Sequence, residues 1–567
     1  MVLAVVLAVA TLIVGRLYFV QVAQGAEYSR KAEQQFAAAG QSGLFDRGSI
    51  YFTTKNGIHV SAATLAAGYL VAINPRLLAA PTAAYDAISA VATTTLSKSA
   101  FLTAAANKNL VYVEVAHGLS SAAGQSLAAQ NITGVELLPE RWRWYPGASL
   151  ATKTIGVVGY GSGSTLIGQS GLEEEYDSVL ERSGGDLLGN FFATLFSGAG
   201  STLVSAQNAR EGDVVTTIEP EVETRLMDDV AAMNATHSSH SSGGIIMDPK
   251  TGAIIALASY PTYNPNDLTN VNPQLLENPL VSHVYEFGSI MKPITMVSAL
   301  SAGVISATST YNDTGCFHVD GSRICNWNYH AYGVIPMKTI IMQSLNVGAS
   351  WVAEQLGHAR MHDYFTKVFG SKTGIDLPNE ATALMSNLSK PQQIYYDTAS
   401  FGEGIAVTPV QMIRAEAAIA NGGTLVTPHV VSSIVLQSGQ TKELSWPSGP
   451  RVFTPQATRE TASMMDGLFS QVLYNGKYNI PGIPVAMKTG TAQLPTPTGT
   501  YYNNRFFDDE VVFFPSNNPR FVILLYTEDP KNAIYGTDTI TPPMIDLIHF
   551  LINYYNITPT EAGTTTP

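Results

Sequence analysis

Two pairs of apolar segments on either side of a long helical stretch limit most strongly how this chain can fold. Residues 243–249 and 253–258 form the first pair, joined by a Pro-Lys-Thr-Gly turn, and residues 511–514 and 521–526 form the second. Short apolar runs bounded by turn residues are typical of buried strands, whereas much of 289–425 has the pattern of helices. This order of strands, helices and strands predicts an α+β or mixed α/β domain built on an antiparallel sheet.

Further elements flank these strand pairs. Residues 214–218 predict a strand that leads into a helix ending near Met233, and residues 544–552 repeat apolar side chains with a helical period. That period gives a helix one apolar face, so we expect the last helix to lie on the sheet. We assign residues 206–556 to this domain and residues 557–567 to a polar tail that need not be ordered.

The part of the chain before this domain carries shorter and more mixed patterns. Residues 25–35 predict a helix, residues 68–75 a strand that ends in a turn, and residues 112–115 a half-buried strand. The region concentrates no nucleophile, general base or set of metal ligands. We therefore expect residues 23–205 to form an elongated, non-catalytic pedestal of mixed α/β structure.

The chain begins with an apolar stretch that only a Gly-Arg pair ending at Arg16 interrupts. About 20 residues cross a bilayer as a helix, provided here that Arg16 reaches the interface. We predict that residues 1–22 form a single-pass membrane anchor; the alternative is a secretory signal peptide with Ala23 and Ala26 near the cleavage site. No basic residue precedes the apolar stretch, so we expect Met1 to lie inside the true anchor. Both interpretations place the bulk of the chain outside the cytoplasm.

Charge and motif content exclude several classes of function. The net charge of −13 argues against a nucleic-acid partner, because such a partner needs a basic surface. The sequence has no Walker loop, no GxGxxG after a strand and no Cys/His cluster with zinc spacing. His237 and His240 lie in a Ser/Thr-rich segment without carboxylates or cysteines nearby, so we expect a solvated loop there and no metal site.

Cys316 and Cys325 are the only cysteines of the chain. Their spacing suits a small disulfide-closed loop in an exported protein, and it equally suits two buried thiols in a cytosolic one. The expected location outside the cytoplasm favours the disulfide.

Ser289 and Lys292 are three residues apart, so on a helix their side chains lie on the same face. A serine hydroxyl becomes a good nucleophile when a base removes its proton, and a lysine amine with a lowered pKa can be that base. Gly288 allows a tight turn, and Pro293 fits only the first turn of a helix. Ser289 is therefore expected at a helix N-terminus, where free N–H groups stabilise an oxyanion. The alternative is an ordinary helix start, yet Lys292 is the only lysine with a serine three positions before it.

A serine acyl-transfer site also needs a second proton carrier and groups that hold the substrate. Ser344 and Asn346 offer a hydroxyl and an amide, two positions apart, that can point the same way from a loop. Ser516 and Asn518 have the same spacing, but they lie in an expected strand-to-strand turn late in the chain. We therefore assign the earlier pair to the site.

Three Lys-Thr-Gly tripeptides occur, and only the last is expected to belong to a site. The copies at 250–252 and 372–374 lie in connections between elements. The third follows residues that read as a strand and continues into another threonine, which gives the set Lys488, Thr489, Gly490 and Thr491. Alternate residues of a strand face opposite sides, so we expect the lysine and glycine on one side and the threonines on the other. The glycine would let a ligand approach the backbone closely.

In this order, Ser-x-x-Lys, Ser-x-Asn and Lys-Thr-Gly are the signature of penicillin-recognising serine transpeptidases and serine β-lactamases. The wider sequence resembles class B penicillin-binding proteins, and the segments that carry this resemblance are 247–254, 286–289, 401–409, 420–423, 143–146 and 171–173. The resemblance covers most of the chain. Phe287, Glu403 and Met487 stand where the family commonly has proline, glutamine and glycine, and none of these departures removes a reacting group.

The resemblance implies a penicillin-binding, serine β-lactamase-like transpeptidase fold and a peptidoglycan stem peptide ending in D-Ala-D-Ala as substrate. It also implies that Lys292 takes the proton of Ser289 and that Ser344 relays a proton to the departing D-alanine. Asn346 would bind the amide of the peptide, and Lys488, with Thr489 and Thr491, would hold its terminal carboxylate. The backbone N–H groups of Ser289 and Thr491, on either side of Gly490, would hold the oxyanion. No metal or other cofactor is required.

The same resemblance implies partners and leaves rivals. β-Lactam antibiotics would acylate Ser289, and a membrane glycan polymerase is the expected partner. A β-lactamase usually lacks a long upstream region such as 23–205. The remaining alternative is a catalytically weak β-lactam-binding scaffold or sensor, although such a protein would be expected to lose Ser289 or Lys488. A role in cell division and a role in elongation both fit the sequence.

Overall fold

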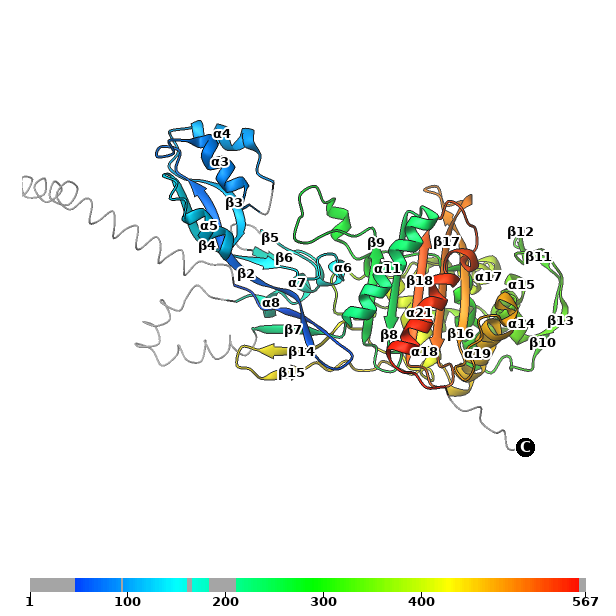
Figure 1. Cartoon of the computed structure of the whole chain (residues 1–567). Coiled ribbons are helices and arrows are strands. Elements are labelled where there is room, and N and C mark those ends of the chain that lie inside the picture. Colours follow the sequence, from blue (N-terminus) through cyan, green and yellow to red (C-terminus); the bar gives the residue numbers. More distant parts are fainter. Residues whose placement is uncertain (1–45, 93–94, 161–165, 183–210, 560–567) are drawn as a thin grey trace, which may run out of the picture. The chain divides into compact units, whose positions relative to one another are not determined.

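The structure of the chain is a computed structural model that describes residues 46–92, 95–160, 166–182 and 211–559 (Figure 1). The expected membrane anchor at 1–22 and the expected helix at 25–35 lie outside these residues, as does most of the expected polar tail. Within the described ranges no helix combines the length and the apolar character that crossing a bilayer requires.

The chain divides into two compact units, and neither unit is continuous in sequence. The core of the N-terminal unit is Thr64–Trp144, whereas the C-terminal unit comprises Ser49–Ala63, Tyr145–Leu180 and Gly212–Pro567. Two segments upstream of residue 206 therefore belong to the C-terminal unit.

The N-terminal unit has mixed α/β structure. Its elements are the latter part of β2 (His59–Ile73), α3 (Pro81–Ser89), α4 (Lys98–Ala106), β3 (Val113–Ser120), α5 (Ser121–Ala128) and β4 (Val135–Trp144). Strand β2 pairs antiparallel with both β3 and β4. The hydroxyls of Ser97 and Ser120 cap α4 and α5 by accepting a backbone N–H of the first turn. Val71, Phe101 and Leu119 lie in the buried core of this unit.

A first sheet of the C-terminal unit joins strands from distant parts of the sequence. Its strands, in spatial order, are β15 (Thr441–Glu443), β14 (Val431–Leu436), β7 (Gly212–Thr216), β1 (Ile50–Thr53) and the first residues of β2. Strand β1 pairs parallel with β7 and antiparallel with β2. Between these strands in sequence lie the short elements α6 (Thr152–Ile155), β5 (Val158–Tyr160), β6 (Leu166–Gly168), α7 (Gly171–Glu175) and α8 (Asp177–Leu180).

The main sheet of the C-terminal unit confirms the predicted antiparallel arrangement. Its order is β16 (Ala486–Pro495), β17 (Tyr501–Phe514), β18 (Phe521–Glu528), β8 (Ser241–Met247) and β9 (Ile254–Tyr260), and all neighbours are antiparallel. One row across the sheet runs Lys488, Val511, Leu524, Ile245 and Leu257. Strand β16 is thus an edge strand, and Lys488 shares a face with buried apolar side chains.

Helices cover both faces of the main sheet. Helices α11 (Pro220–His237) and α21 (Thr541–Tyr554) lie on one face, where Ile246, Val512 and Ile523 join them in one apolar core. On the other face, Ile245, Val511 and Leu524 join a second core with α13 (Lys292–Ser301) and α18 (Pro409–Ala420). Adjacent strand residues thus enter different cores, as the two-residue period of a strand requires.

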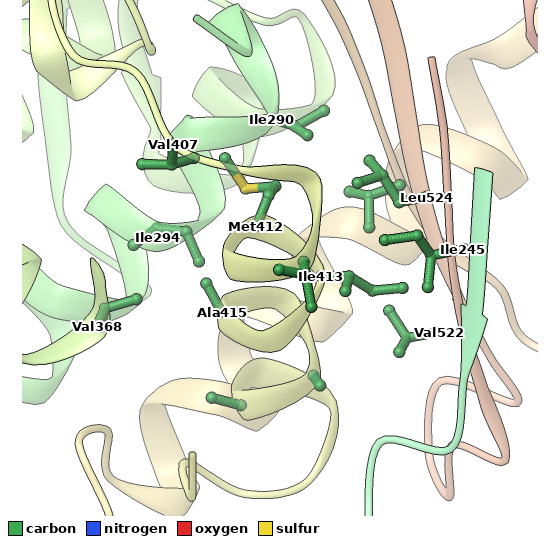
Figure 2. Packing of buried hydrophobic residues seen from close by; sticks show 14 of the residues in the cluster. Ile245, Ile290, Ile294, Val368, Val407, Met412, Ile413, Ala415, Val522 and Leu524 are labelled. Carbon is green, nitrogen blue, oxygen red and sulfur yellow. The ribbon is translucent and has the colours of Figure 1, made fainter. Parts of the chain in front are cut away.

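Helix α18 is the central helix of the second core. Thr408 and Gln411 form a reciprocal capping box at its start, and every residue from Pro409 to Ile419 is buried. Figure 2 shows Ile413 directed toward the sheet and Ala415 directed toward the helix that carries Ile294. A helix that contacts a sheet on one side and helices on the other can be buried on all sides. Burial of one side chain such as Ile413 contributes about 1.5–3 kcal/mol.

The expected helical stretch between the strand pairs is present. It contains α14 (Met337–Met342), α15 (Asn346–Leu356), α16 (His358–Phe369) and α17 (Gln393–Ser400), and α19 (Pro455–Gly467) follows α18. Two small two-stranded sheets precede α14, formed by β10 (Thr310–Asp313) with β13 (Gly333–Pro336) and by the hairpin of β11 (Cys316–Val319) with β12 (Ser322–Cys325). The chemistry-bearing residues predicted from the sequence lie where α13, α14, α15 and β16 meet.

Candidate active site

Ser289 lies in a short 3₁₀ helix, η3 (Gly288–Met291), that runs directly into α13. The α-helix therefore begins at Lys292, one turn after Ser289, and Pro293 lies in its first turn. Gly288 adopts φ +57°, and a Cβ there would lie 2.9 Å from the carbonyl oxygen of Thr491. Only glycine combines this backbone conformation with such a close approach, so Gly288 allows the turn that carries Ser289 to pack against strand β16.

The side chain of Lys292 is 1% exposed and is surrounded by polar groups. Its Nζ lies 2.8 Å from Ser289 Oγ, 2.8 Å from the carbonyl oxygen of Ser344, 3.2 Å from Ser344 Oγ and 2.7 Å from Asn346 Oδ1. The structure thus brings four of the sequence-predicted residues into direct contact around one nitrogen.

The surroundings of Lys292 disfavour its charged form. Burial, and then the positive charge of Lys488, lower the pKa of Lys292 well below its ordinary value, while the nearby Glu403 opposes this shift. No acidic side chain makes an ion pair with Lys292 within the part of the chain that the structure describes. A lysine whose pKa is lowered in this way can act as a base.

Ser344 and Asn346 occupy the junction between α14 and α15. Ser344 has φ +55°, a left-handed conformation that ends α14, and Asn346 is the first residue of α15. Asn346 Nδ2 donates a hydrogen bond of 3.1 Å to the carbonyl oxygen of Cys325. This bond fixes the amide so that its oxygen points to Lys292.

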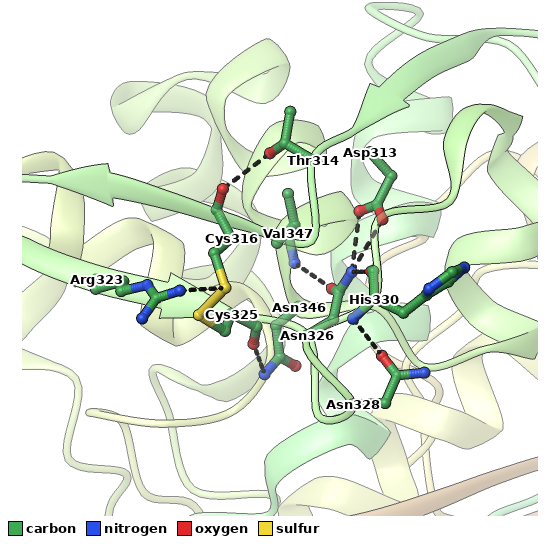
Figure 3. Close-up of a disulfide and its surroundings, with 10 residues drawn as sticks. All are labelled: Asp313, Thr314, Cys316, Arg323, Cys325, Asn326, Asn328, His330, Asn346 and Val347. Atoms are coloured by element: carbon green, nitrogen blue, oxygen red, sulfur yellow. Dashed lines mark hydrogen bonds between the residues drawn. A yellow bond between two sulfur atoms is a disulfide. The ribbon is translucent and has the colours of Figure 1, made fainter.

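Cys316 and Cys325 form a disulfide across the hairpin of β11 and β12 (Figure 3). The hairpin and the loop after it hold the start of α15. Asn326 Oδ1 accepts a hydrogen bond from the backbone N–H of Val347, and Asn326 Nδ2 donates to the carboxylate of Asp313. The cysteine pair therefore belongs to a scaffold that orients Asn346.

Lys488 also contacts Ser344. Its Nζ donates to Ser344 Oγ at 3.0 Å and to the carbonyl oxygen of Thr489 at 2.7 Å, so Ser344 Oγ lies between two lysine nitrogens. Burial lowers the pKa of Lys488 to about 8, while the carboxyl groups of Asp509, Glu510 and Glu416 oppose that shift. The two site lysines thus differ in how readily they keep a proton.

The rest of the Lys-Thr-Gly-Thr segment borders the same space. Thr489 is half-buried, and Thr491 Oγ1 accepts a hydrogen bond from the backbone N–H of Gly536. A Cβ on Gly490 would lie 2.0 Å from Asp509 Oδ1 and 2.7 Å from the carbonyl oxygen of Phe287. A side chain at position 490 would therefore collide with both neighbours.

These residues line one cavity of about 510 Å³. Its walls include Gly288, Ser289, Ser344, Asn346, Glu403, Lys488, Thr489, Gly490, Thr491, Trp327, Tyr535 and Asp538. A larger hollow of about 630 Å³ lies beside α11 and α21, but no serine or cysteine lines it. The other two Lys-Thr-Gly copies lie outside the cavity: Lys250 donates to Asn518 in the turn after β17, and Thr373 bonds to Glu380.

Several residues of this region escaped the sequence analysis. Trp327 and Tyr535 are exposed aromatic side chains of the cavity, and nothing in the sequence connects them to Ser289. Glu403 stood out only as a departure from the family pattern. The sequence did carry one signal for Glu403, because it is an acidic residue in an otherwise apolar and Gly-rich segment that resembles the family closely.

The sequence analysis also missed a group of buried acidic residues on β17, the strand next to β16. Asp508, Asp509 and Glu510 are fully buried on β17, opposite Thr491, Gly490 and Thr489. Thr539 and Thr541 donate hydrogen bonds to Asp508 and Glu510, whereas neither oxygen of Asp509 has a partner among the described residues. Among all the residues that the structure describes, no group of three or more His, Cys, Asp or Glu side chains is arranged so that it could hold a metal ion.

Much of the C-terminal unit is similar to a known protein family. Residues 243–546, more than half of the chain, match the family described as penicillin binding protein transpeptidase domain. Among curated relatives, stage V sporulation protein D of Bacillus subtilis is 27% identical over 438 residues, which are 75% of this chain and 66% of that protein. The match thus spans just under two thirds of that relative's length.

Two further comparisons cover nearly the whole chain. The peptidoglycan D,D-transpeptidase FtsI homolog of Mesostigma viride is 25% identical over 97% of this chain and 94% of its own. The crystal structure of penicillin binding protein 3 from Mycobacterium tuberculosis, complexed with aztreonam, superposes with a TM-score of 0.67 at 21% identity, over 91% of this chain and 98% of that one. The structural likeness shows a shared fold.

Proposed function

We propose that this chain, which belongs to the penicillin-binding protein transpeptidase family, cross-links peptidoglycan stem peptides through an acyl-enzyme at Ser289. A relative that covers nearly the same length carries the name peptidoglycan D,D-transpeptidase, and a protein with the same fold is known in complex with aztreonam. The substrate is then the D-Ala-D-Ala end of a stem peptide, and β-lactams are its mimics.

The observation that carries the proposal is the arrangement of acceptors around Lys292. The carbonyl oxygen of Ser344 and Oδ1 of Asn346 can only accept hydrogen bonds, and they lie 2.8 Å and 2.7 Å from Nζ. A neutral amine has two N–H donors and one lone pair. If the two donors serve these two oxygens, the lone pair remains for the hydroxyl of Ser289, 2.8 Å away.

In the acylation step that follows, the proton of Ser289 moves to Lys292 and Oγ attacks the carbonyl carbon of the penultimate residue. The backbone N–H groups of Ser289 and Thr491 stabilise the oxyanion, and loss of one such donor typically costs about 3 kcal/mol. The oxyanion then collapses, the C–N bond breaks, and the departing D-alanine nitrogen takes a proton through Ser344. Lys292 returns to its neutral form.

Lys488 has a different part in this proposal. Its ammonium, with the hydroxyls of Thr489 and Thr491, holds the terminal carboxylate of the peptide, which is a standard use of a lysine as a point charge. Its hydrogen bond to Ser344 Oγ supports the orientation of that hydroxyl for proton transfer. Asn346 binds the amide of the stem peptide.

The proposal extends to the place and partners of the protein. Residues 1–22 anchor it in the cell membrane, residues 23–205 serve as a pedestal, residues 206–556 carry the chemistry and residues 557–567 form a tail. The bulk of the chain is then extracytoplasmic, which agrees with the disulfide of Cys316 and Cys325. A membrane glycan polymerase would supply the strands that are cross-linked.

Labelling with a fluorescent penicillin tests the proposed nucleophile. The wild-type protein should form a covalent adduct that survives denaturing electrophoresis, and Ser289→Ala should form none. Ser516→Ala is the matched control, because Ser516 lies in the other Ser-x-Asn sequence, outside the cavity. Label on Ser289→Ala would reject the assignment of the nucleophile, and a wild-type protein without label would favour a non-catalytic scaffold.

A further inference from the structure

Glu403 is a carboxylic acid on the wall of the Ser289 cavity that the acylation step does not use. Its backbone is tied to the nucleophile turn, because the N–H of Gly288 donates to the carbonyl oxygen of Gly402 at 3.2 Å. On the other side, the carbonyl oxygen of Gly404 accepts a hydrogen bond of 2.7 Å from Asn387 Nδ2. Glu403 is therefore held at the site by bonds on both sides.

The fit of this loop leaves Glu403 little freedom to move away. Gly402 and Gly404 have φ +87° and +73°, and a Cβ on Gly402 would lie 2.1 Å from the carbonyl oxygen of Gly288. The loop thus packs directly on the residue before the nucleophile. Among the described residues no group donates a hydrogen bond to the carboxylate of Glu403, although it lies within electrostatic range of Lys292.

Three titratable groups face Glu403 from neighbouring elements. Lys292 lies on α13, Glu286 precedes η3, and Tyr501 starts β17 and donates its hydroxyl proton to Glu286 at 2.8 Å. Burial, and then the negative charge of Glu286, raise the pKa of Glu403 to about 7, while Lys292 opposes the shift. Glu286 accepts the hydroxyl proton of Tyr501 and does not line the cavity, whereas Glu403 does.

The second half of the reaction needs a base that takes a proton from the acceptor on the open side of the acyl group. After D-alanine leaves, Lys292 is neutral again and lies beneath the ester oxygen of Ser289. An acceptor amine that attacks the ester carbonyl must lose a proton from its nitrogen as the C–N bond forms. A carboxylate on the cavity wall can take that proton, whereas a glutamine, the residue common in the resembling family at this position, cannot.

We propose that Glu403 is the general base of deacylation, and that it takes the proton of the acceptor amine or, when no amine is present, of water. The C–N or C–O bond to the acceptor forms, the bond to Ser289 Oγ breaks, and the proton taken by Glu403 returns through Lys292 to Ser289 Oγ. The overall step is neutral and needs no further reactant. The inference rests on the proposed acyl-enzyme, and it adds hydrolysis of penicillin as an activity of this chain.

Separate measurement of acylation and deacylation tests this role. A fluorescent penicillin gives the acylation rate constant from the growth of label, and a chase with unlabelled penicillin gives the deacylation rate constant from its loss. General bases typically contribute 10²–10⁴-fold, so Glu403→Gln should slow deacylation by at least about 100-fold and by much more than it slows acylation. The deacylation rate of the wild type should rise with pH through about 7, and this rise should be absent from the variant.

Glu286→Gln is the matched control. It removes the neighbouring charge that raises the pKa of Glu403, so the rise in deacylation should move to lower pH while its plateau stays within a few fold. Equal slowing of both steps by Glu403→Gln would mean that Glu403 acts only through Lys292 or through folding, and would overturn the role. An unchanged deacylation rate would overturn it too. A wild-type protein that takes no label would overturn both this role and the proposed function.

Discussion

At the scale of single residues, the two lysines of the site have the same functional group in different surroundings. Lys292 meets only neutral oxygens at close range, and the charge of Lys488 adds to the effect of its burial. Lys488 is equally buried, but three carboxyl groups lie within electrostatic range of it. One lysine can therefore be a base at the pH at which the other is still a cation.

The pKa of Lys488 gives a prediction for the pH dependence of acylation. The ammonium is present below about pH 8 and is lost above it, so its attraction for the carboxylate of a penicillin is lost as the pH rises. The acylation rate constant should therefore fall above about pH 8, by up to about tenfold per pH unit. Stopped-flow measurements from pH 6 to 10 would show this limb. The methyl ester of the same penicillin lacks the carboxylate and serves as control; an equal fall for both would contradict this role of Lys488.

At the scale of elements, strand β17 carries three consecutive buried acidic residues beside β16, the strand that lines the Ser289 cavity. Asp508 and Glu510 face the core of α11 and α21, and Asp509 faces the core that contains Lys488. Burial raises the pKa of Asp508 to about 7 and that of Glu510 to about 8. Each group that is buried and then ionised weakens the fold, so this strand should make stability sensitive to pH.

The substitution Glu510→Gln tests this sensitivity. The folded protein holds the proton of Glu510 up to about pH 8, whereas the unfolded chain releases it near the ordinary value of 4.5, so the wild type loses stability as the pH rises between these values. Glutamine keeps an acceptor for Thr541 but cannot ionise. The variant should be more stable than the wild type at pH 8, by about 1–3 kcal/mol, and the difference should shrink toward pH 5.

Denaturant unfolding at several pH values measures the effect. Glu443→Gln, at an exposed glutamate of β15, controls for the loss of one carboxyl group. A stability difference that does not change with pH would mean that Glu510 does not titrate in this range.

The elements themselves were largely predictable, and their side-chain environment was not. The strand pairs, the closing helix and the place of Lys488 on a strand follow from periodicity and turn residues, which are local signals. The contact of Lys292 with Ser344 and Asn346 joins residues more than 50 positions apart. Residue types, spacing and the resemblance to a family assigned these residues to one site, but no local signal predicts the contact itself. The register of β16 with β17 decides which acidic residues of β17 lie opposite the Lys-Thr-Gly segment of β16, and no local pattern encodes that register.

At the scale of the whole molecule, the two compact units do not follow the order of the sequence. A boundary placed by composition at residue 206 separates Ser49–Ala63 and Tyr145–Leu180 from the unit with which they pack. Ile50 and Phe52, for instance, lie in the same core as α18. The boundary at residue 206 follows a change in the local sequence pattern. Strand β1, however, lies far upstream and pairs with β7. Local patterns carry no information on pairing between strands so distant in sequence.

The pairing of β2 with β4 has a consequence for protein engineering. Thr64 and Trp144 are opposite each other in that antiparallel ladder, so the chain leaves the C-terminal unit and returns to it at neighbouring positions. Residues 65–143 therefore form a cassette, and an Asn-Gly turn should be able to replace them as a two-residue hairpin. The shortened protein should fold and still take a fluorescent penicillin at Ser289, since every candidate site residue is in the C-terminal unit. An insoluble or unlabelled product would show that the cassette is needed for folding, whereas a labelled one would open this position to exchange with modules of other origin.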